Sequence, residues 1–213
     1  MIKAIIFDFG GVILRTQDWS GRQRWEQRLG LPEHGAEQLV FNSEMGRLAQ
    51  HGRISYDELW QWVGQTCGLS AAELAQFQAD FWAGDVLDGE LVAMIRGLRP
   101  LYQTALISNA FDDLRHVLTD QFAIADAFDV IVISAEEGIM KPDSRIYHMA
   151  LERLGCRPEE AVFIDDFARN IAGAQAVGLH TIHFTPGIDL TGIINDLAAE
   201  INRPNPNNFD KRE

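Results

Sequence analysis

The sequence predicts an α/β protein in which a parallel sheet forms the core and a helical domain is inserted after the first strand. Two observations support this prediction. In the second half of the chain, short apolar runs alternate with helix-like stretches, which is the signature of a parallel sheet. Between the first apolar run and the second, residues 9–102 carry helical signals and no convincing strand.

Five apolar runs are the predicted strands. They are rich in branched residues or end in polar ones, and continuous apolar runs of this length are typical of strands buried on both faces. The runs are Lys3–Asp8, Gln103–Ser108, Asp129–Ser134, Ala161–Asp166 and His180–Phe184.

Three helix-like stretches separate the last four strands. They are Phe111–Phe122, Ser144–Leu154 and Ala168–Val177. The first is amphipathic. The other two end before Gly155 and Gly178, and glycine commonly follows the C-terminus of a helix.

The long insert is predicted to be a small helical domain. Ser55 with Glu58 and Ser70 with Glu73 form two capping boxes, which mark helix starts. Two further helices are predicted over Arg22–Leu29 and Ala36–Leu48, and the insert also holds Trp19, Trp25, Trp60, Trp62 and Trp82, all five tryptophans of the chain. We expect these rings to form mainly the core of the insert, with one or two lining a pocket between the domains.

These patterns predict that the chain is divided into a sheet domain, a helical domain and a C-terminal tail. Residues 1–15 and 97–200 form the sheet domain, residues 16–96 form the helical domain, and residues 201–213 form a polar tail.

Composition narrows the class of partner. The chain has 213 residues and a formal net charge of −13, which argues against nucleic acid and against an anionic membrane surface, because both require a basic footprint. No apolar run approaches the ~20 residues of a membrane span. Cys67 and Cys156 are too few for a disulfide framework. We therefore expect a cytoplasmic protein, a monomer or homodimer, that acts on a small molecule.

Polar residues stand at the ends of the predicted strands. Ligands of open α/β sheets bind outside the carboxyl ends of the strands, so these residues are candidates for the site. They are Asp8, Ser108 with Asn109, Lys141 beyond the third strand, and Asp165 with Asp166.

This set of side chains suits phosphoryl chemistry. Clustered carboxylates repel one another and stay ionised when a divalent cation lies among them, and hard oxygen ligands suit Mg²⁺. A cation and Lys141 would neutralise a phosphoryl group, Ser108 would donate a hydrogen bond to it, and one carboxylate would attack phosphorus.

The chain also resembles the haloacid dehalogenase superfamily, specifically the members with a helical cap inserted after the first strand. The motifs that carry the resemblance are FDFGGVI (Phe7–Ile13), LISNA (Leu106–Ala110), GIMKPD (Gly138–Asp143) and FIDDFARN (Phe163–Asn170). Each motif alone is weak, but four in this order at strand ends are specific. The resemblance implies a Rossmann-like parallel sheet with an α-helical cap and an active site at their junction.

The resemblance also implies roles for individual residues. Asp8 matches the nucleophile that forms an aspartyl intermediate, and Lys141 matches the lysine that stabilises nucleophile and phosphoryl charge. Ser108 and Asn109 match the phosphate-holding motif, again with Lys141. The metal ligands are expected to be Asp8, the backbone carbonyl of Gly10, Asp166 and the adjacent Asp165, and Asn170 lies where many relatives have another acidic residue.

The sequence departs from the common family pattern at Gly10. Many relatives have a second aspartate there, which protonates the leaving oxygen, and such acid–base help is typically worth ~10²–10⁴-fold. A proton would then come from water, the substrate or a cap residue, with His51 and Asp57 as candidates. Gly10 also argues against a phosphomutase.

Three functions remain open at this point. The first is a Mg²⁺-dependent phosphatase acting on a small phosphomonoester, such as a sugar phosphate. The second is a metal-free 2-haloacid dehalogenase, and the third is a weakly active metabolite-binding protein. The paired acids Asp165 and Asp166 favour the phosphatase, because extra carboxylates would hinder a site that binds a substrate carboxylate and releases halide.

Overall fold

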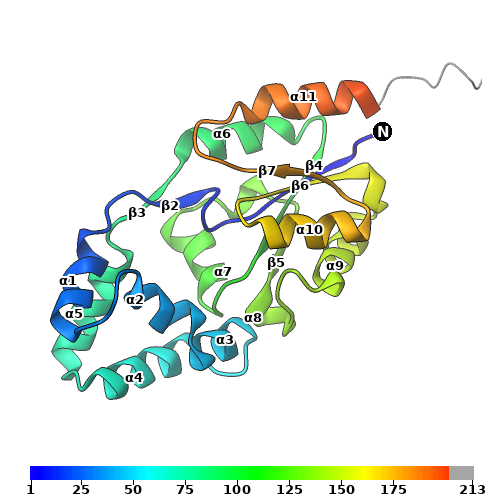
Figure 1. The fold of residues 1–213 in the computed structure, drawn as a ribbon. Helices are drawn as coiled ribbons and strands as arrows, with labels where there is room; N and C mark the ends of the chain where they lie inside the picture. The colour runs from blue at the N-terminus through cyan, green and yellow to red at the C-terminus, as the bar shows by residue number, and fades with distance from the viewer. Residues whose placement is uncertain (202–213) are drawn as a thin grey trace, which may run out of the picture.

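The computed structural model describes residues 1–201, and the predicted polar tail beyond Ile201 lies outside the described residues. Five parallel strands form one sheet in the order β5-β4-β1-β6-β7 (Figure 1). The strands are β1 (Ala4–Phe7), β4 (Gln103–Ser108), β5 (Val130–Ile133), β6 (Ala161–Asp165) and β7 (His180–His183). Each falls within one of the five predicted runs, which confirms the predicted α/β class.

The first strand occupies the centre of the sheet. All four residues of β1 are buried, and Phe7 lies opposite Leu106 of β4 on one side and Ile164 of β6 on the other. Because the three strands are parallel and in this register, the residues that follow them meet at the same edge. This arrangement places Asp8 between the ends of β4 and β6.

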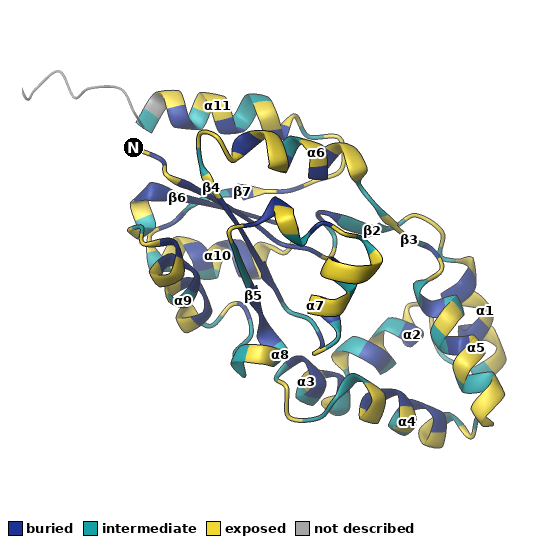
Figure 2. Ribbon diagram, turned by 180° about the vertical axis from the view of Figure 1, so that it is seen from behind, coloured by how far each residue is buried: buried dark blue, intermediate teal, exposed yellow. Residues whose placement is uncertain are grey.

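Helices cover both faces of the sheet (Figures 1 and 2). Ile5 and Phe7 of β1 share a hydrophobic cluster with the helices on one face, and Ala4 and Ile6 share a second cluster with those on the other. The first face carries α6 (Gly89–Leu98), α7 (Leu114–His116) with the π-helical turn Val117–Gln121, the 3-10 turn Ala125–Ala127, and α11 (Leu190–Ile201); the second carries α9 (Ser144–Leu154) and α10 (Ala168–Val177). Two short elements, α8 (Ser134–Glu137) and the 3-10 turn Pro158–Glu160, complete the sheet domain.

The insert forms a separate helical layer with its own core. Its elements are α1 (Ser20–Leu29), α2 (Gly35–Glu37), the π-helical segment Gln38–Asn42, α3 (Glu44–Gln50), α4 (Tyr56–Cys67) and α5 (Ala71–Trp82). Both predicted capping boxes are present, at Ser55 and Ser70. Trp25 and Trp60 are buried in this core, which confirms that tryptophans pack inside the insert.

The prediction that residues 9–102 contain no strand is wrong. Two short strands, β2 (Leu14–Thr16) and β3 (Asp85–Leu87), form an antiparallel ribbon where the insert leaves and rejoins the sheet. Each strand is only three residues long and is stabilised by the other, so neither produces a local apolar pattern. Helix α6 packs its buried Leu91 and Ile95 into the sheet cluster. The domain boundary at residue 97 stays a prediction, and this packing favours a boundary before α6.

Two predicted helices are interrupted. The expected helix Ala36–Leu48 changes to π-helical geometry and ends at Ser43, whose side chain caps α3 by accepting a hydrogen bond from Gly46. The expected helix Phe111–Phe122 begins only at Leu114 and continues as a π-helical turn. Across residues 1–201, no helix has the length and apolar character that crossing a membrane requires.

Candidate active site

The carboxyl edge of the sheet gathers three acidic side chains. Asp8 follows β1, Asp165 ends β6, and Asp166 comes directly after it. One carboxylate oxygen from each of these residues lies within 4.8 Å of the other two. The structure therefore brings together the three carboxylates that the sequence predicted as site residues from two distant motifs.

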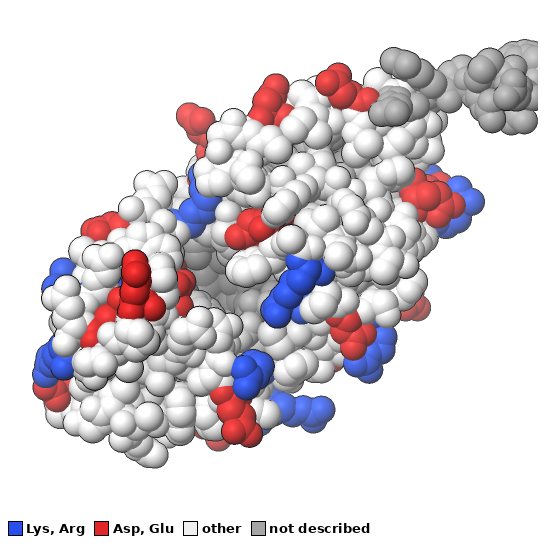
Figure 3. Space-filling view, viewed as in Figure 1, with Lys and Arg blue, Asp and Glu red and all other residues white. Residues whose placement is uncertain are grey.

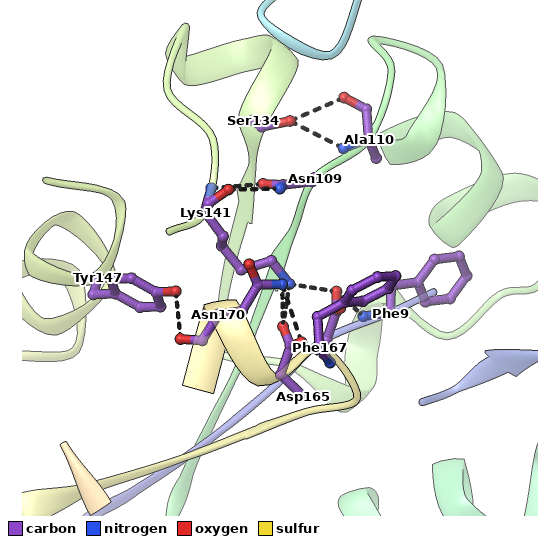
Figure 4. Close-up of polar contacts among 10 residues, drawn as sticks. Phe9, Asn109, Ala110, Ser134, Lys141, Tyr147, Asp165, Phe167 and Asn170 are labelled. Carbon is purple, nitrogen blue, oxygen red and sulfur yellow. Dashed lines mark hydrogen bonds and ion pairs between the residues drawn. The ribbon is translucent and has the colours of Figure 1, made fainter. Parts of the chain in front are cut away.

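Lys141 supplies the positive charge at this edge (Figure 4). Its Nζ lies 2.7 Å from Oδ1 of Asp8 and 2.7 Å from Oδ2 of Asp165. The lysine side chain is 1% exposed, and those of Asp8 and Asp165 are 8% and 0% exposed. A buried ammonium between two buried carboxylates is held in place by both ion pairs. Removing the lysine would leave two buried carboxylates without their cation.

Asn109 holds the neighbouring loop, and Ser108 precedes it at the end of β4. The Asn109 side chain accepts a hydrogen bond from the Lys141 backbone N–H at 2.7 Å and donates one to the Lys141 carbonyl at 3.0 Å. Ser108 is buried at the end of β4. Asn109 thus positions Lys141, and the phosphate-binding role expected for Ser108 and Asn109 stays a prediction.

The adjacent acids Asp165 and Asp166 have different surroundings. Besides Lys141, Asp165 accepts hydrogen bonds from the Phe167 backbone N–H at 2.7 Å and from Nδ2 of Asn170 at 3.0 Å to each oxygen. Asn170 therefore contacts Asp165 rather than Asp166. In contrast, Oδ1 of Asp166 is buried and has no hydrogen-bond partner within residues 1–201.

Gly11 makes room for the Asp166 carboxylate. A Cβ atom at Gly11 would lie 2.1 Å from Oδ2 of Asp166, and the backbone of Gly11 has φ +80°. Gly10 differs in both respects, because it has no positive φ and a Cβ there would meet nothing within 4 Å. The close approach that requires glycine is therefore at Gly11, next to the position where many relatives carry a second aspartate.

The charges at this edge are unbalanced. Burial raises the pKa of Asp8 strongly, Lys141 opposes this effect, and Asp165 adds to it. Burial and the neighbouring Asp165 also raise the pKa of Asp166. Three carboxylates share one ammonium, so a bound cation would allow all three to remain ionised. The buried, unpartnered oxygen of Asp166 is a group that such a cation would satisfy, and the donor set fits Mg²⁺.

Asp8 is oriented by two donors on the same oxygen. Its Oδ1 accepts hydrogen bonds from the Phe9 backbone N–H at 2.7 Å as well as from Lys141. These contacts fix the rotation of the carboxylate, and neither of them involves its second oxygen, Oδ2.

Sequence reasoning missed two supporting residues. The hydroxyl of Ser134 accepts a hydrogen bond from the Ala110 N–H and donates one to the Ala110 carbonyl, which anchors the loop after Asn109. Tyr147 donates a hydrogen bond to the Asn170 carbonyl at 2.9 Å. A polar residue at the end of a predicted strand was the available signal for Ser134, whereas nothing in the local sequence marks Tyr147.

The two candidate proton donors lie in different places. Nδ1 of His51 is 3.3 Å from the Gly138 carbonyl, so this ring lies at the junction of cap and sheet domain. Asp57 is exposed on α4. Their role in proton delivery stays a prediction.

Comparison with known proteins agrees with the motifs. The model of the haloacid dehalogenase-like hydrolases matches residues 2–178. The chain is 28% identical over 187 residues to the sesquiterpene phosphatase astK of Aspergillus oryzae, covering 87% of this chain and 91% of that protein. It is 28% identical over 208 residues to the D-ribitol-5-phosphate phosphatase of Bacteroides thetaiotaomicron, covering 92% and 100%. The chain is 25% identical over 199 residues to mouse bifunctional epoxide hydrolase 2. That match covers 85% of this chain but only 36% of the mouse protein.

Solved structures share the fold. A HAD-like family hydrolase from Porphyromonas gingivalis superposes with a TM-score of 0.77 at 26% identity, covering 92% of this chain and 98% of that chain. A HAD family enzyme from Bacteroides thetaiotaomicron was determined in complex with magnesium and inorganic phosphate. It superposes with a TM-score of 0.77 at 22% identity, covering 91% of this chain and 99% of that chain. Since the family model spans most of its length and the four motifs meet at one edge of its sheet, the chain belongs to the haloacid dehalogenase-like hydrolases.

Proposed function

We propose that this protein is a Mg²⁺-dependent phosphatase that hydrolyses a small phosphomonoester through an aspartyl-phosphate on Asp8. The observation that carries the proposal is the arrangement at the sheet edge, where Lys141 contacts Asp8 and Asp165 while a buried oxygen of Asp166 lacks a partner. Two relatives that match nearly the whole chain are phosphatases by name, one of them acting on D-ribitol 5-phosphate. Sugar phosphates are therefore the first substrates to test.

The metal would be held by Asp8, Asp166 and the backbone carbonyl of Gly10, with Asp165 beside them. When bound, Mg²⁺ would neutralise charge on the phosphoryl oxygens and on the surrounding carboxylates. Asp165 already accepts hydrogen bonds from Lys141 and Asn170, so we assign it mainly to positioning and Asp166 to direct coordination.

The remaining steps use groups of the chain itself. The Asp8 carboxylate attacks phosphorus, and the bond between phosphorus and the leaving oxygen breaks, so that the alcohol departs and takes up a proton. Lys141 stabilises the negative charge shared by Asp8 and the phosphoryl group, and Ser108 donates a hydrogen bond to a phosphoryl oxygen. Water then attacks phosphorus, phosphate leaves, and the Asp8 carboxylate is regenerated.

A substrate screen tests this proposal. Phosphorylated metabolites, with sugar phosphates first, are incubated with the protein with and without Mg²⁺, and released phosphate is measured. We expect release only with the metal. Halide release from 2-haloacids without metal would instead support a dehalogenase, and inactivity in both assays with retained ligand binding would support a binding protein.

A further inference from the structure

We propose that the substrate carries a second anionic group, a carboxylate or a second phosphate, and that this group binds a basic cavity between cap helix α3 and the sheet domain. The inference rests on the proposed function and specifies its substrate class. The cavity has a volume of about 290 Å³. Its charged and polar lining residues are Arg47, His51, Lys141, Asp143, Arg145 and Arg169.

The cavity adjoins the catalytic edge. Lys141 lines it and also contacts Asp8 through Nζ. Arg169 lies in the first turn of α10, three residues after Asp166, and Arg47 comes from α3 of the cap. Figure 3 shows the surface hollowed between the cap and the sheet domain, with basic and acidic side chains around the hollow. A substrate whose phosphoryl group lies at Asp8 could therefore extend toward residues of both domains.

Two arginines of the cavity, Arg47 and Arg169, form no ion pair with a carboxylate of residues 1–201. Among residues 1–201, nearly every Lys or Arg forms an ion pair with a carboxylate, including Arg145 with Asp143. In this part of the chain only Arg47, Arg53 and Arg169 form no such pair, and two of these three line the same cavity. Arg47 uses one of its donors on the Asn42 carbonyl, which orients the side chain without neutralising it.

Free guanidinium groups at this place are informative because the protein is strongly acidic. A net charge of −13 repels anions from most of the surface. Guanidinium groups bind carboxylate and phosphate with paired, charge-assisted hydrogen bonds. The exposed N-terminal turn of α10 adds positive potential on the Arg169 side. His51 lines the same cavity, with its Nδ1 3.3 Å from the Gly138 carbonyl.

Non-hydrolysable ligands separate this inference from the proposed function. The ligands are alkylphosphonates over a range of chain lengths, ending in a hydroxyl, a carboxylate or a second phosphonate. Their dissociation constants are measured calorimetrically with Mg²⁺ present. We expect wild-type protein to bind the acidic members at one preferred length about tenfold more tightly than the hydroxyl member. In the double variant Arg47→Gln/Arg169→Gln, the ratio of the two dissociation constants should fall to about one. The control is Arg53→Gln, which removes an unpaired arginine outside the cavity and should keep the wild-type preference.

Three results would overturn the inference. These are the absence of any preference for the acidic members, an equal preference at every chain length, and an equal loss in Arg53→Gln and in the double variant. An equal preference at every chain length would indicate a general positive electrostatic potential of the cavity rather than a defined subsite. If the hydroxyl member does not bind, that result contradicts the proposed phosphoryl site itself. If the acidic members also do not bind, both proposals are contradicted.

Discussion

Asn109 holds the backbone of Lys141 on both sides, accepting a hydrogen bond from its N–H and donating one to its carbonyl. One short motif after β4 therefore fixes the position of the cation that follows β5. The same lysine contacts Asp8 and Asp165 through its Nζ. Lys141 and the segment Ser108–Asn109 are in this sense one structural unit.

Replacing Lys141 should impair catalysis and stability separately. Lys141→Ala leaves two buried carboxylates without their cation, a change that typically destabilises by about 3–5 kcal/mol. Turnover should fall by about 10²–10³-fold even at saturating Mg²⁺, because the phosphoryl charge loses a fixed donor. The melting temperature and kcat are measured over a Mg²⁺ titration. Mg²⁺ should recover part of the melting temperature but not kcat, and recovery of both would show that the metal substitutes for Lys141.

The two adjacent acids should differ in their effect on metal binding. Asp166→Asn removes a carboxylate whose buried Oδ1 has no partner within the described chain, so the Mg²⁺ concentration for half-maximal activity should rise by about tenfold or more. Asp165→Asn disturbs the contacts to Lys141 and Asn170 and should mainly lower the melting temperature. Calorimetric titration with Mg²⁺ alone checks the comparison. Equal losses of affinity would mean that the assignment of the direct ligand is wrong.

The missing acid at Gly10 should make turnover depend steeply on the leaving group. Aryl phosphates and sugar 1-phosphates should react fast and alkyl phosphates slowly, since their leaving oxygens differ in the need for a proton. A Cβ atom at position 10 meets nothing within 4 Å, so the backbone has room for a side chain there. Gly10→Asp should raise alkyl phosphate turnover by up to ~10²-fold, which flattens the dependence. Gly11→Ala, in contrast, collides with Asp166 and should weaken Mg²⁺ binding. A folded, metal-binding Gly10→Asp protein with an unchanged dependence would show that another group already supplies the proton.

Asp113 should limit stability above neutral pH. Burial and the neighbouring Asp112 raise the pKa of Asp113 to about 6, so the folded state binds this proton more tightly than the unfolded state. Stability is therefore lost as the pH rises from about 4 to 6, and the loss stays constant above that range. Asp113 makes no side-chain cap contact, so Asp113→Asn should raise the melting temperature by about 2–4 °C at pH 8. The gain should disappear near pH 4, and an equal gain at both pH values would rule out this cause.

The elements of the sheet were predictable because each carries its own local signal. Helices Ser144–Leu154 and Ala168–Val177 have the predicted bounds, since glycine ends both. The three acids of the site were predictable for a similar reason, because parallel strands deliver their final residues to one edge. The resemblance to a known family added their expected roles.

The remaining features depend on contacts between distant segments. The β2–β3 ribbon joins segments on either side of the insert, and Phe111, in the loop after β4, packs in the core of the cap against Phe41. The different surroundings of Asp165 and Asp166 arise from Asn170 and Gly11. Asn170 belongs to the same motif, but the sequence does not show that it contacts Asp165, and Gly11 comes from a distant segment. The unpaired state of Arg47 and Arg169 likewise requires knowledge of every other ion pair.

The turnover of Asp8→Asn tests the central claim most directly. The amide keeps the shape of the carboxylate beside Lys141 and the Phe9 N–H, but it cannot attack phosphorus. Hydrolysis of an aryl phosphate at saturating Mg²⁺ is measured with pure protein whose circular dichroism matches the wild type. The covalent mechanism predicts a loss of at least ~10³-fold. Retention of more than about a few per cent of wild-type turnover, far above that residual level, would contradict nucleophilic catalysis by Asp8.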